Sequence, residues 1–423
     1  MLTSVNLSNR LSKQLTTEIE VFLHTIGDAA SRLGYNTYLV GGAVRDLLLG
    51  TSTTDIDIVV EGNAITLVKS LPLGHANVKV HPAFGTANLK WNHTSIDLAT
   101  ARSEIYPQPG QLPEVTPSNI NRDLFRRDFT INAMAVSLNR INFGELIDPY
   151  RGLADLKNRL IRILHEKSFI DDATRIWRAI RYEQRLNFKI EPETLTLLKR
   201  DTDMLDTITG DRVRRELELV LRENKPEKVL NRAGELKVLT KITGGLVEKK
   251  WLAEKYNEAR ALGLSDTSLI TVYFSLLIYS LNIAELNKLT TYLRFTRPVF
   301  QILKNTLELK EQLPVLEVSS LLDSKVYFTL NEYPELAVIA NLVATDNSSI
   351  KKHIENYLTR LRHIKPRLNG NDLKRLGIPQ SPEINKLLHI LYVAKLDKKV
   401  ITKQGETRLV YNWLRERENN KTK

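Results

Sequence analysis

The segment that most constrains the fold spans residues 39–59, LVGGAVRDLLLGTSTTDIDIV, and joins a double-glycine turn to an Asp-x-Asp strand. Gly41 and Gly42 permit close backbone approach, and a helix that begins directly after them points its positive end at the same turn. Asp55 and Asp57 lie two residues apart on an apolar strand, so both carboxylates face one side of it. The segment therefore predicts an α/β unit with an anion-binding turn beside two carboxylates.

These residue types suit phosphate and metal chemistry. Carboxylate oxygens are ligands that Mg²⁺ prefers, and a two-metal site holds its ions roughly 3.5–4 Å apart. Arg45, in the helix after the turn, adds a guanidinium that can bind phosphate oxygens through two hydrogen bonds. A lone Gly-Gly is usually only a tight turn, and a lone Asp-x-Asp is often a solvated strand end. Their combination predicts a phosphate site with Asp55 and Asp57 as metal ligands.

The hydrophobic pattern changes along the chain. Apolar residues recur at helical spacing over the first 30 or so positions, then short apolar runs alternate with turns as far as Asp148. Beyond Gly152 strand signals nearly vanish, and amphipathic helices follow one another. The sequence therefore predicts an α+β N-terminal domain followed by all-α domains, with breaks near Lys237–Gly245, Pro314 and Lys365–Gly370. The expected strands are Tyr38–Gly41, Ile56–Val60, Val78–His81, Thr86–Trp91, Ser95–Ala99 and Asn132–Leu138.

The positive charge is concentrated at the C-terminal end. The chain has a formal net charge of +12, and residues 351–423 carry 18 Lys and Arg against 7 Asp and Glu. Such a basic module indicates a polyanion partner, with RNA or DNA as the leading class, although a merely soluble basic surface is the alternative.

Several classes of protein are disfavoured. The absence of cysteine excludes disulfides, Cys-based zinc sites and thiol nucleophiles. Thr267–Ala284 is an uncharged stretch, but its Thr, Ser, Tyr and Asn residues favour a buried helix over a membrane span. The first residues lack the apolar region of a signal peptide. We therefore expect a cytoplasmic protein that does not contact a membrane, and no protein partner is indicated.

Two further clusters carry charge next to apolar runs. Residues 123–135, DLFRRDFTINAMA, place two arginines and an acid at a helix end. Arg126 or Arg127 could bind phosphate and Asp128 could accept hydrogen bonds from ribose hydroxyls, but a structural salt-bridge cluster explains the pattern equally well. Asp97, on a strand expected beside that of Asp57, could add a third carboxylate, or could be a surface or capping residue.

The third cluster, residues 169–188, is expected to form one helix on which Asp172 and Arg175 are neighbours and Arg178 and Arg181 continue at the same spacing. A solvated, salt-bridged helix is the usual meaning of such charges. However, adenine and cytosine share an exocyclic amine beside an unprotonated ring nitrogen. An Asp can accept from the amine while an Arg donates to the ring nitrogen, so the pair fits these bases and rejects guanine and uracil.

Taken together, GGAVRDLLLG, DID, RRDFTINAMA, IDPYRGLADLKNRLIR and DDATRIWRAIRY strongly resemble the class II tRNA nucleotidyltransferases and the related bacterial poly(A) polymerases. The resemblance covers residues 20–240 in detail. It implies a polymerase-β-type nucleotidyltransferase head over residues 1–152, a helical neck over 153–240, a helical body over 241–350 and a basic, tRNA-binding tail over 351–423.

The resemblance also implies roles for single residues. Asp55 and Asp57 match metal-binding catalytic carboxylates and Asp97 the third of them, in a two-Mg²⁺ reaction in which an RNA 3′-hydroxyl attacks the α-phosphate of CTP or ATP and pyrophosphate departs. The segment after Arg102 is expected to be a flexible loop. The nucleotide-binding positions that it implies are Gly42, Arg45, Arg126, Arg127, Asp128, Asp172, Arg175, Arg178 and Arg181.

The implied activity is addition of CCA to the 3′ end of tRNA, held by its acceptor stem and elbow. An A-adding or CC-adding specialist, a poly(A) polymerase and an inactive RNA-binding homologue remain open. Asp171, Ala173 and Trp177 replace the Glu, Pro and Leu usual in the family's base-reading motif.

Overall fold

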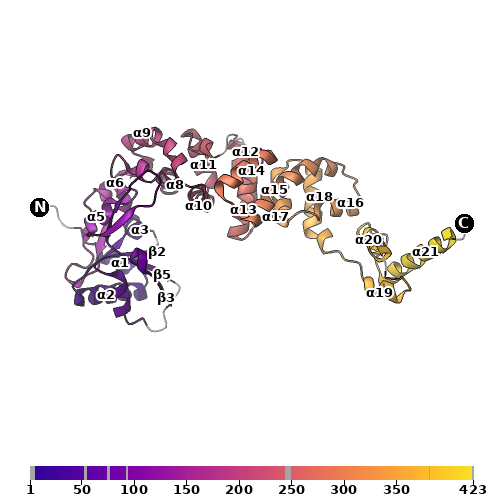
Figure 1. The fold of residues 1–423 in the computed structure, drawn as a ribbon, viewed down its shortest axis with the longest axis horizontal. Helices are drawn as coiled ribbons and strands as arrows, with labels where there is room; N and C mark the ends of the chain where they lie inside the picture. Colours follow the sequence, from indigo (N-terminus) through magenta and orange to yellow (C-terminus); the bar gives the residue numbers. More distant parts are fainter. Residues whose placement is uncertain are drawn as a thin grey trace. The chain divides into compact units, whose positions relative to one another are not determined.

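The computed structural model describes residues 5–51, 55–73, 77–91, 94–242, 249–380 and 382–421 (Figure 1). The chain divides into two compact units, Met1–Ile242 and Thr243–Lys423. The first combines a seven-stranded sheet with helices, and the described part of the second is helical. The predicted α+β class with an all-α remainder is therefore confirmed, whereas the four-domain division stays a prediction. Its boundary at 350 falls inside the helix α18 (Ser348–Thr359).

Two helices precede the sheet, as the apolar spacing predicted. They are α1 (Ser8–Gln14) and α2 (Thr17–Arg32), and α2 is capped by Thr16, whose side chain accepts a hydrogen bond from the Ile19 backbone N–H. Phe22, Leu23 and Ile26 of α2 are buried. This helix packs against the first strand and against α4 (Ala64–Ser70).

The sheet has the order β3-β4-β5-β2-β1-β8-β9, in which β2 and β5 are the parallel pair and all other neighbours are antiparallel. All six expected strands form, but the last covers only three residues because Asn132 lies in a 3₁₀ turn before it. Over the first four residues of β2 the less buried and the buried residues alternate, so Asp55 and Asp57 share a face as predicted. The strands are β1 (Asn36–Val40), β2 (Asp55–Glu61), β3 (Asn77–His81), β4 (Thr86–Trp91), β5 (Thr94–Thr100), β8 (Ala135–Ser137) and β9 (Leu146–Ile147).

The segment expected to be a flexible loop contains regular structure instead. An antiparallel hairpin of β6 (Arg102–Ile105) and β7 (Glu114–Pro117) is followed by α5 (Ile120–Phe125). At its tip Gly110 has φ +75°, and a Cβ there would lie 2.4 Å from the Thr207 carbonyl oxygen. Arg212 donates to the Gly110 carbonyl oxygen at 3.3 Å. The hairpin is thus docked against residues about 100 positions later in the chain, which no local pattern signals.

The rest of the first unit is helical apart from a two-residue parallel pair, β10 (Leu160–Ile161) and β11 (Lys189–Ile190). Trp177, Ile176 and Ile180 of α8 are fully buried. Helices α10 and α11 pack against α8. The helices are α6 (Gly152–Asn158), α7 (Ser168–Asp171), α8 (Thr174–Leu186), α9 (Pro192–Arg200), α10 (Gly210–Leu221) and α11 (Pro226–Glu235).

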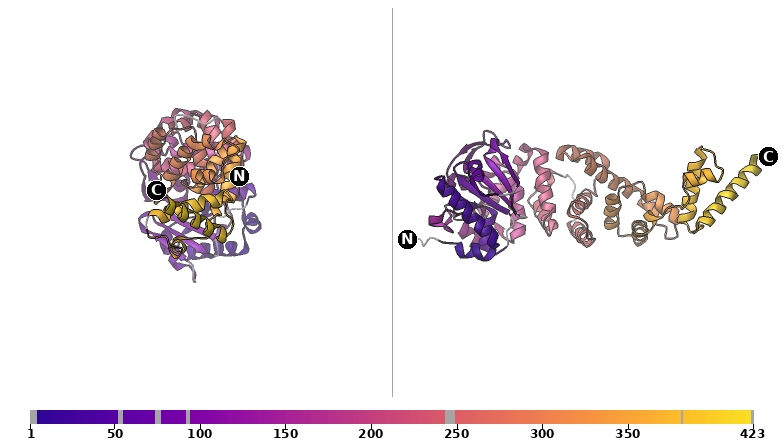
Figure 2. Two further views of the ribbon diagram at one scale, coloured as in Figure 1. Left: turned by 90° about the vertical axis from the view of Figure 1, so that its right-hand side faces the viewer. Right: turned by 90° about the horizontal axis from the view of Figure 1, so that it is seen from below.

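The described part of the second unit consists of helices built around apolar clusters (Figure 2). One cluster joins residues from Leu309 to Leu396, and another runs from Leu368 to Val410. Residues 267–277 of the uncharged stretch lie in the largely buried helix α13 (Asp266–Leu277), as expected, whereas the rest of the stretch forms the turn after α13 and the start of α14. Among the described residues, no helix has both the length and the apolar character needed to cross a bilayer. The other helices are α12 (Lys249–Arg260), α14 (Ile283–Leu293), α15 (Arg297–Gln312), α16 (Asp323–Leu330), α17 (Glu335–Ala344), α19 (Gly370–Arg375), α20 (Pro382–Leu396) and α21 (Lys403–Lys421), with α13 at Asp266–Leu277.

Candidate active site

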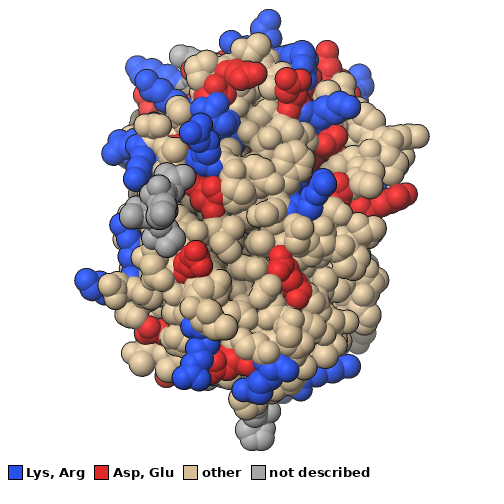
Figure 3. Space-filling view, turned by 90° about the vertical axis from the view of Figure 1, so that its left-hand side faces the viewer, with Lys and Arg blue, Asp and Glu red and all other residues tan. Residues whose placement is uncertain are grey.

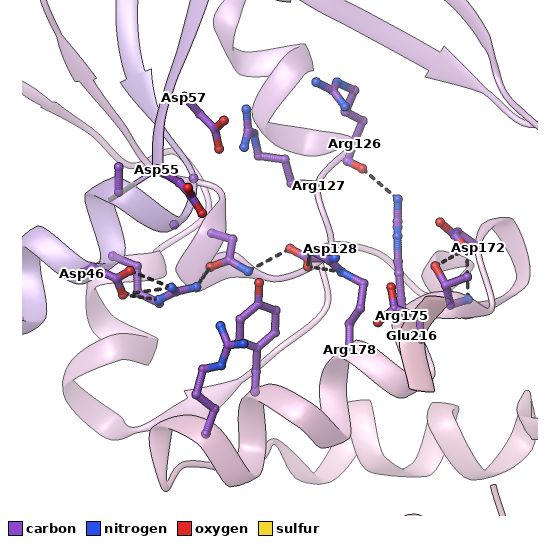
Figure 4. A pocket seen from close by; sticks show the side chains of 18 of the residues that line it. Asp46, Asp55, Asp57, Arg126, Arg127, Asp128, Asp172, Arg175, Arg178 and Glu216 are labelled. Carbon is purple, nitrogen blue, oxygen red and sulfur yellow. Dashed lines mark hydrogen bonds and ion pairs between the residues drawn. The ribbon is translucent and has the colours of Figure 1, made fainter. Parts of the chain in front are cut away.

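The first unit contains a cleft of about 610 Å³ between the sheet and the helices that follow it (Figure 4). Its walls come from α3 (Gly42–Leu49), β2, the β6–β7 hairpin, the segment after α5, α8 and α10. Most of the lining side chains are charged. The residues that line the cleft are Gly41, Gly42, Ala43, Arg45, Asp46, Asp55, Asp57, Glu104, Tyr106, Arg126, Arg127, Asp128, Asn132, Asp172, Thr174, Arg175, Arg178, Tyr182, Arg185 and Glu216.

The double-glycine turn opens α3 as the sequence predicted. Gly41 has φ +71° and ψ −134°, a conformation that residues with a Cβ rarely adopt, and α3 begins at Gly42. Arg45 is buried in the next turn, where it donates to both carboxylate oxygens of Asp46 and, at 2.7 Å, to Oδ1 of Asn132. The guanidinium is therefore held in one orientation at the cleft wall.

Three carboxylates meet on one face of the sheet. Asp55 and Asp57 project from β2 into the cleft (Figure 4). Asp97 lies directly opposite Asp57 in the parallel β2–β5 register. Asp97 is exposed, does not line the cleft, and accepts a hydrogen bond from Asn88 at 2.7 Å. The structure thus brings the predicted third carboxylate beside the other two.

This crowding affects the pKa of the Asp57 carboxyl. Burial raises that pKa most, Arg127 opposes the shift, and the charges of Asp97 and Asp55 raise it further. A cation bound here would relieve the repulsion, so the donor set fits a divalent ion. Among the described residues no group of three or more acidic or histidine side chains could by itself hold a metal ion. Mg²⁺ is commonly bound by one or two protein carboxylates together with substrate phosphates, and Asp55 and Asp57 can be those carboxylates.

The two arginines of the RRD motif share one buried acid. Arg126 and Arg127 both pair with the fully buried Asp123, at 2.8 and 3.1 Å, and Arg126 also pairs with Glu104 at 3.0 Å. The structural salt-bridge cluster therefore exists, and both arginines also line the cleft. Arg127 points toward Asp57 (Figure 4), and its buried Nε has no hydrogen-bond partner within the described residues. This N–H is a donor that an anion could use.

Asp128 is committed to internal partners. Its Oδ2 accepts two hydrogen bonds from Arg178, at 2.6 and 2.8 Å, and its Oδ1 accepts from the Phe129 backbone and from Asn132. Burial raises the pKa of the Asp128 carboxyl, but Arg178 and these hydrogen bonds outweigh burial and lower it to about 2. Because four bonds occupy the lone-pair sites of a carboxylate, ribose recognition by Asp128 would require one of them to exchange. That role stays a prediction.

Asp172 does not share a helix with Arg175, contrary to the prediction. It lies at the junction where α7 ends and α8 begins, in an extended conformation, because its Oδ1 accepts from the backbone and hydroxyl of Thr174 in the manner of a helix cap. The same oxygen accepts from Arg212 at 2.7 Å. No hydrogen bond to Oδ2 is found among the described residues, so this oxygen can accept one from a ligand.

Arg175 is buried in the adjacent wall. Its Nη1 donates to the Ser168 hydroxyl at 2.7 Å and its Nη2 to the Arg126 carbonyl oxygen at 2.8 Å. These bonds fix the guanidinium next to Asp172, and a guanidinium has five N–H groups, so further donors remain. The pair expected to read a base edge therefore lines one cleft together.

Most of the predicted nucleotide-binding positions line the cleft, but Arg181 is not among its lining residues. It is buried beside the cleft and paired with Glu216 and Glu223. Sequence reasoning missed Tyr182 and Arg185, which follow Arg178 at helical spacing on the same face and could have been found from that spacing. It also missed residues that only the fold brings in: Asp46, Glu104, Tyr106, Asn132 and Glu216.

Comparisons with known proteins agree with this architecture. Residues 37–162 match the poly A polymerase head domain, and residues 187–246 match the probable RNA and SrmB-binding site of polymerase A. An A-adding tRNA nucleotidyltransferase of Halalkalibacterium halodurans is 30% identical over 95% of this chain and 94% of its own length. One of Geobacter sulfurreducens is 35% identical over 94% of this chain. A solved CCA-adding enzyme in its apo form has a TM-score of 0.83 and 30% identity over 97% of this chain and all of its own. The Thermotoga maritima CCA-adding enzyme complexed with tRNA has a TM-score of 0.78 and 30% identity over 98% of this chain and all of its own.

The chain therefore belongs to the tRNA nucleotidyltransferase family, and it contains the head domain that is also found in poly A polymerases. It spans about half the length of some of the curated relatives it matches, with 47% of the Geobacter protein and 42% of the Aquifex aeolicus one.

Proposed function

We propose that this chain adds nucleotides to the 3′ end of tRNA without a nucleic-acid template, using CTP and ATP to build CCA. One observation carries the proposal: a single cleft holds the Asp55 and Asp57 carboxylates and the Asp172–Arg175 pair, with arginines between them. Asp55 and Asp57 can hold the metal ions that act on phosphates, and Asp172 and Arg175 can select a base. An enzyme that uses a nucleoside triphosphate requires both kinds of contact, one for the triphosphate and one for the base.

Base selection follows from hydrogen-bond polarity. The Oδ2 of Asp172 can accept from the exocyclic amine of cytosine or adenine, and a remaining N–H of Arg175 can donate to the neighbouring ring nitrogen. Guanine and uracil present a carbonyl and an N–H at these positions, so each would face a like group. The Arg212 and Ser168 contacts hold the pair in place before the base arrives, which favours discrimination.

At the other end of the cleft, Asp55 and Asp57 would hold Mg²⁺, with Asp97 adding negative charge beside them. Bound magnesium would lower the pKa of the attacking hydroxyl and offset charge on the phosphates. Arg45 and Arg127 present guanidiniums on the same side of the cleft, where they can stabilise the departing pyrophosphate.

The second candidate is addition of the terminal A alone. It is favoured because the A-adding relatives match 81–95% of this chain, whereas solved CCA-adding enzymes favour the first proposal. CC addition and poly(A) synthesis are the remaining outcomes. Two tRNA transcripts, one lacking CCA and one ending in CC, incubated with CTP and ATP separately and together, distinguish these activities. CCA on the first transcript supports the proposal, extension of the CC-ended transcript alone supports A addition, and long A tails indicate a polymerase.

We further propose that the second unit binds tRNA, because residues 351–423 carry most of the net positive charge of the chain. The face of the first unit seen in Figure 3 has acidic and basic side chains interspersed around a broad uncharged area and does not form a basic patch. Contact with the acceptor stem and elbow of tRNA stays a prediction of the family resemblance. A cytoplasmic location likewise stays a prediction from the sequence.

The metal-ligand assignment is tested by replacing Asp55 and Asp57 together with alanine. Nucleotide incorporation should fall to background, since the ligands are lost, while tRNA binding measured by filter retention should stay within about twofold. Asp28→Ala, which removes an exposed carboxylate of α2 outside the cleft, is the matched control and should retain incorporation. Incorporation by the double variant at the wild-type rate would contradict the assignment.

A further inference from the structure

Four guanidiniums surround one aromatic ring at the cleft wall. The Cζ atoms of Arg45, Arg181, Arg178 and Arg185 lie 5.2, 5.3, 5.7 and 5.8 Å from the centroid of the Tyr182 ring. A single contact of this kind is ordinary, whereas the convergence of four like charges on one ring is unfavourable unless something offsets their repulsion.

Each guanidinium has an acid on one side and the ring on the other. Arg45 pairs with Asp46 and Arg181 with Glu216. Arg178 pairs with Asp128 and Arg185 with Glu223. The negative face of the aromatic quadrupole then supplies attraction that the acids cannot, because it lies between the cations. The ring is only 8% exposed, so water screens this attraction little.

Residues from distant parts of the first unit contact the Tyr182 ring. Tyr182 lies on α8, whereas Arg45 lies on α3, 137 positions earlier in the chain. Phe129 contacts the Tyr182 ring edge-on, with centroids 5.8 Å apart and planes at 82°. Phe129 directly follows Asp128, which anchors Arg178. The orientation of the ring is therefore coupled to that of the arginines.

The arginines that line the cleft retain hydrogen-bonding capacity. Arg178 uses two of its five N–H groups in bonds to Asp128, and Arg185 uses two in bonds to Glu223. Both side chains are partly exposed, at 32% and 41%. Their other N–H groups can bind an anion that enters the cleft.

We propose that Tyr182 is a positioning residue for the polyphosphate of the substrate: its ring orders the surrounding guanidiniums into a preformed site for the triphosphate and for the departing pyrophosphate. This proposal rests on the proposed function for the identity of the ligand. Because the ring orders the arginine side chains before the ligand binds, they lose less conformational entropy on binding.

The test is calorimetric titration of the full chain with inorganic pyrophosphate in a Mg²⁺-containing buffer, a measurement that needs no turnover. Tyr182→Leu should weaken pyrophosphate binding about tenfold, and Tyr182→Phe, which keeps the ring, should stay within about twofold of wild type. In incorporation assays the Leu variant should raise the KM for ATP or CTP more than it lowers kcat. Tyr38→Leu removes a buried tyrosine of β1 that does not line the cleft, and it should leave pyrophosphate binding unchanged.

A second series guards against a folding defect of Tyr182→Leu. Phenylalanines bearing one, two and three fluorines at position 182 keep the shape of the ring while reducing the negative potential of its face, so pyrophosphate binding should weaken stepwise with fluorination. A flat series, or no binding of pyrophosphate by the wild-type chain, would overturn the inference. Stepwise weakening in a chain that incorporates no nucleotide would instead retain the polyphosphate site and refute the proposed function.

Discussion

Replacing Asp128 with Asn tests whether the ion pair with Arg178 stabilises the first unit. The pKa of the Asp128 carboxyl is about 2 in the folded chain against an ordinary value of 3.8, because Arg178 and the surrounding hydrogen bonds outweigh its burial. At 1.36 kcal/mol per unit, a shift of nearly two units corresponds to a stabilisation of about 2 kcal/mol at neutral pH. The carboxyl is nearly buried, so solvent screening reduces this value little.

The sign of the pH dependence follows from the lowered pKa. A depressed pKa means that the folded state binds the proton more weakly than the unfolded state, so the stabilisation is complete above pH about 4 and is lost as pH falls through about 2. Near pH 3 roughly half of it should remain. The Asn side chain has nearly the same size but no charge, so the stability difference between wild type and Asp128→Asn should narrow on acidification.

The assay is urea unfolding of wild type and Asp128→Asn between pH 7 and pH 3, followed by tryptophan fluorescence, to which the buried Trp177 of the first unit contributes together with the three other tryptophans of the chain. We expect a deficit of about 2 kcal/mol at pH 7 that shrinks to about 1 kcal/mol at pH 3. A deficit that is the same at every pH would indicate that packing rather than charge is lost. Equal stability at pH 7 would refute the reasoning altogether.

Two further substitutions probe the cleft. Gly41→Ala should destabilise the chain by about 1–3 kcal/mol, because position 41 has a positive φ. It should also lower nucleotide incorporation, because the new Cβ would lie 2.9 Å from Nη1 of Arg127 and displace that guanidinium from Asp57. Thermal unfolding measures the first effect and the incorporation rate the second, and incorporation at the wild-type rate would contradict the second. Arg212→Met removes the side chain that donates to both Asp172 and the Gly110 carbonyl at the hairpin tip. The ratio of kcat/KM for the preferred nucleotide to kcat/KM for UTP or GTP should therefore fall about tenfold. An unchanged ratio would show that base selection by Asp172 does not depend on its hydrogen bond from Arg212.

Local patterns predicted most of the elements and the local placement of several candidate site residues. Strand alternation placed Asp55 and Asp57 on one face of β2, and the double glycine preceded α3. Such patterns succeed because side-chain direction along a strand or helix depends on backbone geometry over a few residues. Asp172 was misplaced because capping by its own side chain interrupts the helix, a local competition that helical spacing does not reveal.

Most of the long-range pairing lay beyond the sequence. Asp97 was expected on a strand beside that of Asp57, but a surface or capping role stayed open, and the parallel β2–β5 register is what places it opposite Asp57. The hairpin and α10 reached the cleft through contacts spanning about 100 residues. Arg181 carried the same spacing signal as Arg178, yet Glu216 and Glu223 hold it outside the cleft lining.

The sequence by itself determined the family, the double-glycine turn and the Asp-x-Asp strand, and it named Asp172 and Arg175 as a pair, since each is carried by residues close together in the chain. Only the tertiary structure decided which arginines face the cleft and that Arg45 meets the ring of Tyr182 from another part of the chain. The physical reason is that a buried charge takes the partner that folding brings nearest, and that choice depends on the packing of distant elements rather than on the neighbours of the residue in sequence.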